Sequence, residues 1–169
     1  FVSLTAYIMA LVIGVAIGAA RTRTGPLSWA ATAVFEFFSS IPLKVQMFFF
    51  YFVLPALLAP KFVETASPLT LSLVAAIGAL GFFMGCRVSG HIYAGIQALA
   101  DSQAQVSRSL GFSTWQTYTL ILIPQALKNS FPALVNELLS TVKNSSIAGA
   151  IGLAELFCRC KQLNEFTAA

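Results

Sequence analysis

The chain has 169 residues, of which 57% are hydrophobic and only 9% charged, whereas ordinary soluble domains carry about 25% charged residues. This composition excludes an ordinary soluble domain and predicts a protein that lies in a lipid bilayer. Ten Lys and Arg against six Asp and Glu give a formal net charge of +4, but the chain has neither a dense basic stripe nor an RNA-binding motif, so we predict no nucleic-acid partner.

Four apolar runs have the length of membrane spans. The first, residues 1–20, carries no charge and no proline, and a helix that crosses the hydrocarbon needs about 20 such residues. The expected fold is an all-α, polytopic membrane helix bundle that forms a single transmembrane domain over residues 1–169. Its spans are predicted at about residues 1–20, 43–60, 66–86 and 129–152.

A secretory signal is the alternative interpretation of the first run. Signal peptides carry their basic residues before the apolar core, whereas Arg21 and Arg23 follow it here. The chain also starts with Phe inside an apolar run. We therefore expect a true span, in a fragment that lacks part of its N-terminal sequence.

Basic residues predict the orientation in the membrane, because Lys and Arg collect on the cytoplasmic side. With residue 1 outside, the cytoplasmic segments contain Arg21, Arg23, Lys44, Arg87, Arg108 and Lys128. The external segments contain Lys61, Arg159 and Lys161, accompanied by Glu64, Glu155 and Glu165. We predict that residues 101–124 lie in the cytoplasm and residues 153–169 outside.

Residues 27–40 have the periodicity of an amphipathic helix between the first two spans. The apolar positions at helical spacing are Leu27, Ala30, Ala31, Val34, Phe35 and Phe38. Ser28, Thr32 and Glu36 line the other side, and Trp29 suits the headgroup zone. We predict a helix on the cytoplasmic membrane surface, with a plain packing helix as the alternative.

Residues 101–124 are polar and lie between apolar runs. Gly111 follows a short predicted helix at 103–110 and is suited to the left-handed conformation that ends a helix. Ser113 and Gln116 have the spacing of a capping box, which predicts a second helix in a new direction. We call residues 101–124 the elbow, and we expect it to press on a partner at the membrane surface.

The fourth span carries polar residues at two interleaved helical spacings. One set is Asn136, Ser140 and Lys143, and the other is Glu137, Thr141 and Asn144. Facing lipid, Glu137 and Lys143 would each cost at least about 2.5 kcal/mol near the bilayer centre. We predict a translocation route along this stripe, with interhelical hydrogen bonding as the alternative.

Motifs for catalysis or metal binding are absent from the sequence. Cys86, Cys158 and Cys160 do not have zinc-site spacing, and His91 has no carboxylate near it in the sequence. We predict no catalytic and no metal-ligating residues, and we expect His91 to be a packing or pathway residue. Two GxxxG patterns, at Gly14 with Gly18 and at Gly81 with Gly85, favour close helix packing.

Several motifs together resemble one family. These are FEFFSSIPLKVQMFFFYFVLP, the run ILIPQALKNSFPALVNELLSTVKNSSI after the elbow, and AEL near the end. In this order and spacing, over nearly the whole chain, they resemble the permease subunits of ABC importers for polar amino acids. In that family the elbow is the EAA loop, and here Gly111 matches its glycine, while Ile121 and Pro124 match the element that follows it.

The resemblance implies how such a subunit works. The elbow would dock on a cytoplasmic ABC ATPase dimer through Gln105, Val106, Ser107, Arg108, Leu110, Gly111 and Phe112. The substrate path would use Asn136, Glu137, Ser140, Lys143 and Asn144, with Arg87 and His91 at its cytoplasmic mouth. The chain itself would hold no cofactor, since ATP and Mg²⁺ would bind the ATPase. The other implied partners are a second permease subunit, an extracytoplasmic amino-acid-binding protein and the bilayer of the bacterial cytoplasmic membrane.

The chain also departs from the family pattern. Ser39 stands where an arginine is usual, and Arg87, Gly90 and Tyr93 replace the usual Tyr, Glu and Arg. Gln105 replaces the acidic residue of the elbow, and the final span of the family is expected to be missing. We keep as an alternative a structural or regulatory membrane subunit that binds an ATPase without moving substrate.

Overall fold

The computed structural model describes residues 2–152, except for the side chains of Phe62, Ala100, Asp101, Ser102, Ala104 and Arg108. The described part is helical, without strands. Its elements are α1 Val2–Arg21, α2 Pro26–Ser40, α3 Leu43–Phe48, the π-helix η1 Phe49–Val53, α4 Leu54–Leu58, α5 Pro60–Thr65, α6 Pro68–Ser109, α7 Thr114–Gln116, the π-helix η2 Thr117–Leu122, α8 Ile123–Ser145 and the 3-10 helix η3 Ser146–Ile151.

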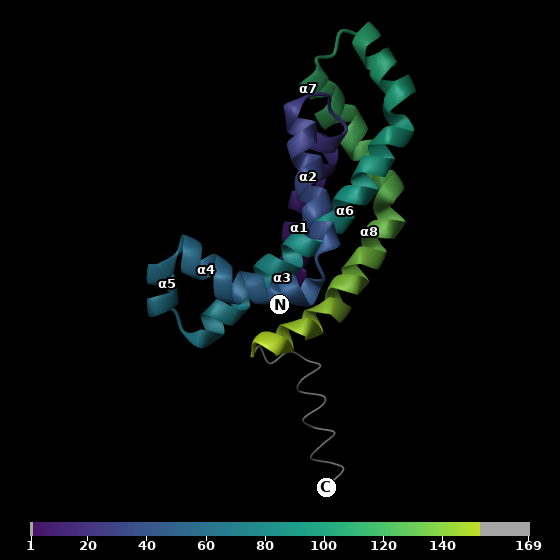
Figure 1. Cartoon of the computed structure of the whole chain (residues 1–169). Helices are drawn as coiled ribbons and strands as arrows, with labels where there is room; N and C mark the ends of the chain where they lie inside the picture. The colour runs from purple at the N-terminus through teal and green to yellow at the C-terminus, as the bar shows by residue number, and fades with distance from the viewer. Residues whose placement is uncertain (1, 153–169) are drawn as a thin grey trace, which may run out of the picture.

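The helices α1 and α6 form the centre of the bundle and run parallel to each other (Figure 1). A Cβ atom added at Gly14 would lie 2.4 Å from Val88 Cγ1, and one at Gly18 would lie 2.8 Å from Ile92 Cβ. Gly81 and Gly85 approach α1 in the same way, at Met9 and Ile13. The GxxxG patterns therefore do predict close packing, and the contact that they make is between the first and third predicted spans.

The helix α8 packs antiparallel to α6. Ser130 contacts His91, Glu137 contacts Arg87, and Asn144 contacts Met84. The residue numbers of the partners on α6 therefore fall as those on α8 rise. Figure 1 shows α8 crossing the bundle beside α6. This pairing brings the polar residues of the fourth predicted span against the middle of α6.

Residues 27–40, predicted to lie on the cytoplasmic membrane surface, form α2. α2 lies along α1 and α6 in the antiparallel direction, with Ser28 bonded to the end of α1 and the ring of Phe38 packed against that of Phe82 of α6. α1 and α6 are the two described helices that are long and apolar enough to cross a membrane, and α2 packs along both. The face turned inward carries Ser28, Ala31, Thr32, Phe35 and Phe38, while Leu27 and Trp29 are exposed.

The second predicted span, 43–60, is neither straight nor a span by itself. The chain turns by 103° between α2 and the segment Leu43–Leu58, and only together are the two long and apolar enough to cross a membrane. Pro42 prevents α2 from continuing, since it lacks the N–H that the helix needs. Gln46 stabilises the turn, because its buried amide donates to the carbonyls of Phe38 (2.6 Å) and Ile41 (3.1 Å).

The third predicted span and the predicted helix 103–110 are one helix. α6 continues unbroken for 42 residues, from Pro68 to Ser109, so the helix predicted as a short one at 103–110 is the end of a long helix. The fourth predicted span lies in α8 and η3, and α8 is too polar to be one of the described helices that are long and apolar enough to cross a membrane. The predicted external segment 153–169 lies outside the described residues.

Both π-helices come just before a proline. η1 precedes Pro55 and η2 precedes Pro124, and the N–H groups of Leu54 and Ile123 bond to carbonyls five residues back, at Phe49 and Tyr118. A proline cannot donate to the carbonyl four residues before it, so a wider turn accommodates it. Such π-turns are frequent at functional sites, and η2 belongs to the elbow.

Candidate functional site

A charged cluster joins the middle of α6 to the middle of α8. Nε and Nη2 of Arg87 donate to the Oε2 and Oε1 atoms of Glu137, at 2.9 and 3.0 Å. His91 Nε2 lies 3.2 Å from the same Oε1. Arg87 and His91 are four residues apart, which places them on one face of α6. The cluster therefore holds one carboxylate between an arginine and a histidine.

Burial differs sharply across this cluster. The side chain of Glu137 is 6% exposed, whereas those of Arg87 and His91 are 52% and 37% exposed. A buried carboxylate is costly unless it is paired and hydrogen-bonded, and a two-bond arginine fork is the strongest neutral-pH partner for it. Glu137 is thus held inside the bundle by Arg87, and about half of the Arg87 side chain remains exposed.

The predicted polar stripe of the fourth span does not form one continuous face. Glu137 and Thr141 are buried against α6, and Asn144 is half-buried with its Nδ2 3.7 Å from Met84 Sδ. Asn136 and Lys143 are exposed and Ser140 is half-buried. Part of the stripe packs against α6, and the remainder is exposed on the surface of the described bundle.

Sequence reasoning did not find the partners of Glu137. His91 has no carboxylate near it along the chain, and only the antiparallel packing of α8 on α6 brings Glu137 to it. The sequence did contain a signal for this contact, since Arg87 and His91 are four residues apart, one helical turn, in an apolar run. Two such groups on one face indicate a buried anion opposite them.

The elbow has the local structure that its sequence predicts. Gly111 adopts a left-handed conformation, with φ of 81°, and the N–H of Phe112 donates to the carbonyl of Ser107 at 3.0 Å, which is the bonding of a glycine-terminated helix. Ser113 and Gln116 form the expected capping box, with each side chain bonded to the other's backbone N–H. The corner between α6 and α7 is therefore rigid.

The predicted ATPase-contact residues of the elbow differ in exposure. Gln105, Val106, Leu110 and Gly111 are exposed and Phe112 is half-buried. Ser107 is buried and donates to the carbonyl of Gln103. The side chain of Arg108 lies outside the described part. The exposed members form a mainly apolar tip on the end of α6.

Hydrogen bonds join the elbow to the end of α1. Thr22 Oγ1 donates to the Tyr118 hydroxyl at 3.1 Å, and that hydroxyl lies 3.3 Å from the Thr22 carbonyl. The guanidinium of Arg23 stands 4.9 Å from the centre of the Tyr118 ring. The ends of α1 and of the elbow therefore lie together.

Arg21 forms a second joint at this end of the bundle. Its guanidinium lies between the rings of Phe35 (3.7 Å) and Tyr93 (4.5 Å) and donates to Ser89 Oγ at 3.4 Å. It thereby contacts both α2 and α6. Within residues 2–152, no group of three or more His, Cys, Asp or Glu side chains is placed to hold a metal ion; Cys158 and Cys160 lie outside that range.

Comparisons with known proteins agree on one kind of protein. A family model described as "Binding-protein-dependent transport system inner membrane component" matches residues 10–167. The glutamate/aspartate import permease protein GltJ of Escherichia coli (strain K12) is 32% identical over 98% of this chain and 70% of its own length. The probable glutamine ABC transporter permease protein GlnM of Bacillus subtilis (strain 168) is 35% identical over 92% of this chain and 68% of its own. A crystal structure of an amino acid ABC transporter with histidines superposes with a TM-score of 0.77 at 28% identity, covering 99% of this chain and 75% of that one.

Proposed function

The chain belongs to the family of binding-protein-dependent transport system inner membrane components, and from this premise we propose that it forms the translocation path for a polar amino acid in an ATP-driven importer. Membership confirms the resemblance seen in the sequence, the all-helical permease fold and a multi-pass location in the inner membrane. A permease subunit is a transport component and not an enzyme. The proposal concerns the substrate, the coupling and the partners.

The charged cluster between α6 and α8 is the observation that carries the proposal. In this ion pair Glu137 is buried and Arg87 is half exposed, so a zwitterionic substrate that reaches Arg87 can exchange partners with the pair. Ionisable residues within membrane spans also mark substrate pathways. Lys143 is exposed and has no ion-pair partner among the described residues. We assign Lys143 to the substrate carboxylate, while Glu137 receives the substrate ammonium when Arg87 releases it.

Coupling to ATP hydrolysis is assigned to the elbow. We propose that its apolar tip docks on a cytoplasmic ABC ATPase dimer, which binds ATP and Mg²⁺, while this chain holds no cofactor. The rigid corner at Gly111 and the bonds from Tyr118 to Thr22 would pass the movement of the ATPase to α1 and α6. A second permease subunit and an extracytoplasmic amino-acid-binding protein complete the proposed importer.

Transport measurements test the substrate path. In vesicles containing the permease with its co-expressed ATPase and binding protein, the variant K143Q should reduce uptake of the transported amino acid about tenfold, since a hydrogen bond to a charged group contributes about 1.5 kcal/mol or more. K44Q, which also removes an exposed lysine, is the matched control and should transport normally. Equal uptake by K143Q and K44Q would contradict the assigned role.

A panel of amino acids separates transport from regulation. If the chain forms a path, at least one polar amino acid should stimulate ATP hydrolysis by the assembled complex and accumulate in the vesicles. An ATPase that binds the permease but responds to none of them would favour the regulatory subunit.

Cross-linking tests the elbow. After replacement of the native cysteines by serine, L110C should cross-link to the ATPase, whereas T24C, exposed at the same end of the bundle, should not. Cross-linking through T24C alone would place the ATPase elsewhere.

A further inference from the structure

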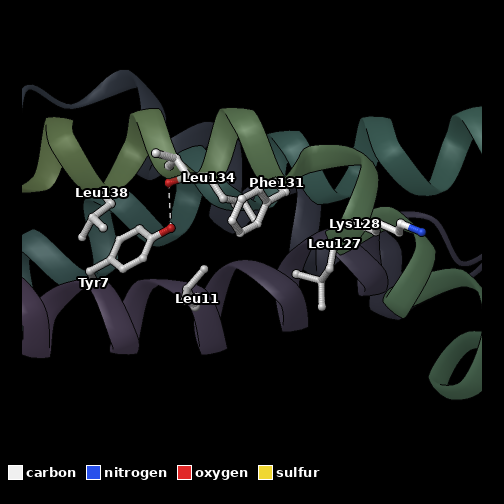
Figure 2. A pocket seen from close by; sticks show the side chains of 8 residues that line it. Tyr7, Leu11, Leu127, Lys128, Phe131, Leu134 and Leu138 are labelled. Carbon is white, nitrogen blue, oxygen red and sulfur yellow. Dashed lines mark hydrogen bonds between the residues drawn. The ribbon is translucent and has the colours of Figure 1, made fainter.

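A long apolar groove lies between α1 and α8, on the outside of the bundle (Figure 2). Its volume is about 480 Å³. The residues that line it are Tyr7, Leu11, Leu127, Lys128, Phe131, Leu134, Val135 and Leu138. The groove is separate from the charged cluster, because Glu137 points from α8 toward α6.

The wall of this groove offers almost no polar atom. The Tyr7 hydroxyl donates to the carbonyl of Leu134 at 2.7 Å, so its hydrogen is already used. Figure 2 shows this bond, with Leu11 and Phe131 beside it. Among the lining side chains, only Lys128 then carries a group that needs a polar partner.

Lys128 lies at one end of the groove, and Figure 2 shows its amine pointing away from Tyr7 and beyond Phe131. That end belongs to the start of α8, next to the elbow. The side chain is exposed and forms no salt bridge with the described residues. The predicted orientation places this end on the cytoplasmic side, where a lysine reaches the headgroups and meets anionic lipids.

We propose that the groove binds one acyl chain of an anionic phospholipid, with the headgroup phosphate beside Lys128. A single phospholipid then provides an acyl chain that contacts the apolar walls and a phosphate that pairs with Lys128. The inference uses the membrane location of the chain and does not depend on the proposed substrate path.

Photo-cross-linking in nanodiscs tests the occupant. The assembled importer would be reconstituted with phosphatidylglycerol that carries a diazirine in its acyl chain, and labelled peptides would be mapped by mass spectrometry. We expect label on Leu11 and Phe131. L11W should fill the groove and abolish this label, whereas V12W, a change at the exposed neighbour, should leave it.

Lys128 is tested by the choice of headgroup. K128Q should lower labelling by phosphatidylglycerol about fivefold, the change expected for one basic group near an anionic surface, and should leave labelling by phosphatidylcholine with the same photoreactive chain unchanged. K44Q should alter neither. Thermal unfolding of each variant shows whether the bundle is intact.

Two results would overturn the proposal. One is equal labelling of wild type by the two lipids, which would remove the role of the headgroup. The other is a photoreactive amino acid at Phe131 that cross-links to protein instead of lipid, which would show that another polypeptide fills the groove. Neither experiment measures transport, so the lipid site can be confirmed even if the proposed function is contradicted.

Discussion

The two contacts that α6 makes with its long neighbours are built differently. Against α1 it packs through glycines on both helices, at distances where a single added methyl group would collide with the other helix. Against α8 it packs through an ion pair and through hydrogen bonds such as that from Ser130 to the His91 carbonyl (3.1 Å). The first contact depends on shape and has no alternative arrangement. The second uses polar groups that can exchange partners, so it is the contact that a transport cycle is able to change.

Replacing Arg87, the more exposed partner of the ion pair, is expected to have the largest effect on stability. R87M leaves Glu137 buried with only His91 beside it from this cluster, which should lower the free energy of unfolding by about 3 kcal/mol, the lower end of the range for a broken buried pair, because Arg87 is half exposed and His91 remains. The measurement is unfolding of the detergent-solubilised protein. E137Q should cost less, since Arg87 can turn to water, and the double variant R87M/E137Q should recover most of the loss. An unchanged stability in R87M would show that the pair does not hold α6 to α8.

Adding one methyl group to the α1 contact ranks second. G14A places a Cβ atom 2.4 Å from Val88 and 2.9 Å from the carbonyl of Gly85, so the helices must separate, at a cost of about 1–3 kcal/mol. G90A is the matched control on α6, because its Cβ would meet only Phe35, at 4.0 Å. That variant should keep its stability or gain up to about 1 kcal/mol from the better helix propensity of alanine. Equal losses in both variants would contradict the shape argument.

Removing the serine hydroxyl from the polar contact should have a smaller effect. S130A loses the hydrogen bond to the His91 carbonyl, and a single such bond contributes about 0.5–1.5 kcal/mol. The same unfolding titration measures this loss. S109A, which removes an exposed hydroxyl on α6, is the control and should change stability by less. A loss as large as that of G14A would show that the two contacts do not differ in kind.

The smallest effect is expected at His91. H91Q keeps a donor near Glu137 but removes the ring, and because the side chain is partly exposed the change should stay below about 1 kcal/mol. Unfolding of H91Q and of R87M/H91Q would measure it. A loss close to that of R87M would show that histidine, and not arginine, is the main partner of the carboxylate.

Local chemistry made several features predictable from sequence. The left-handed turn at Gly111 and the capping box of Ser113 and Gln116 depend on neighbouring residues, so residue type and spacing were enough. The close approach of α1 and α6 followed from glycines at a spacing of four. The helix predicted at 103–110 is not a short one but the end of α6, because a polar change in composition at residue 101 marks a change of surroundings and not the end of a helix.

Composition determined that this chain is a helical membrane protein, because 9% charged residues cannot cover a soluble surface, and its motifs determined the family. Tertiary structure decided which groups meet. Arg87 and Glu137 are 50 residues apart along the chain, and α2 packs along α1 and α6, because packing depends on which face each helix turns to its neighbours. Periodicity gives each helix a polar and an apolar side, but the partner of each side is fixed only when all the helices pack together.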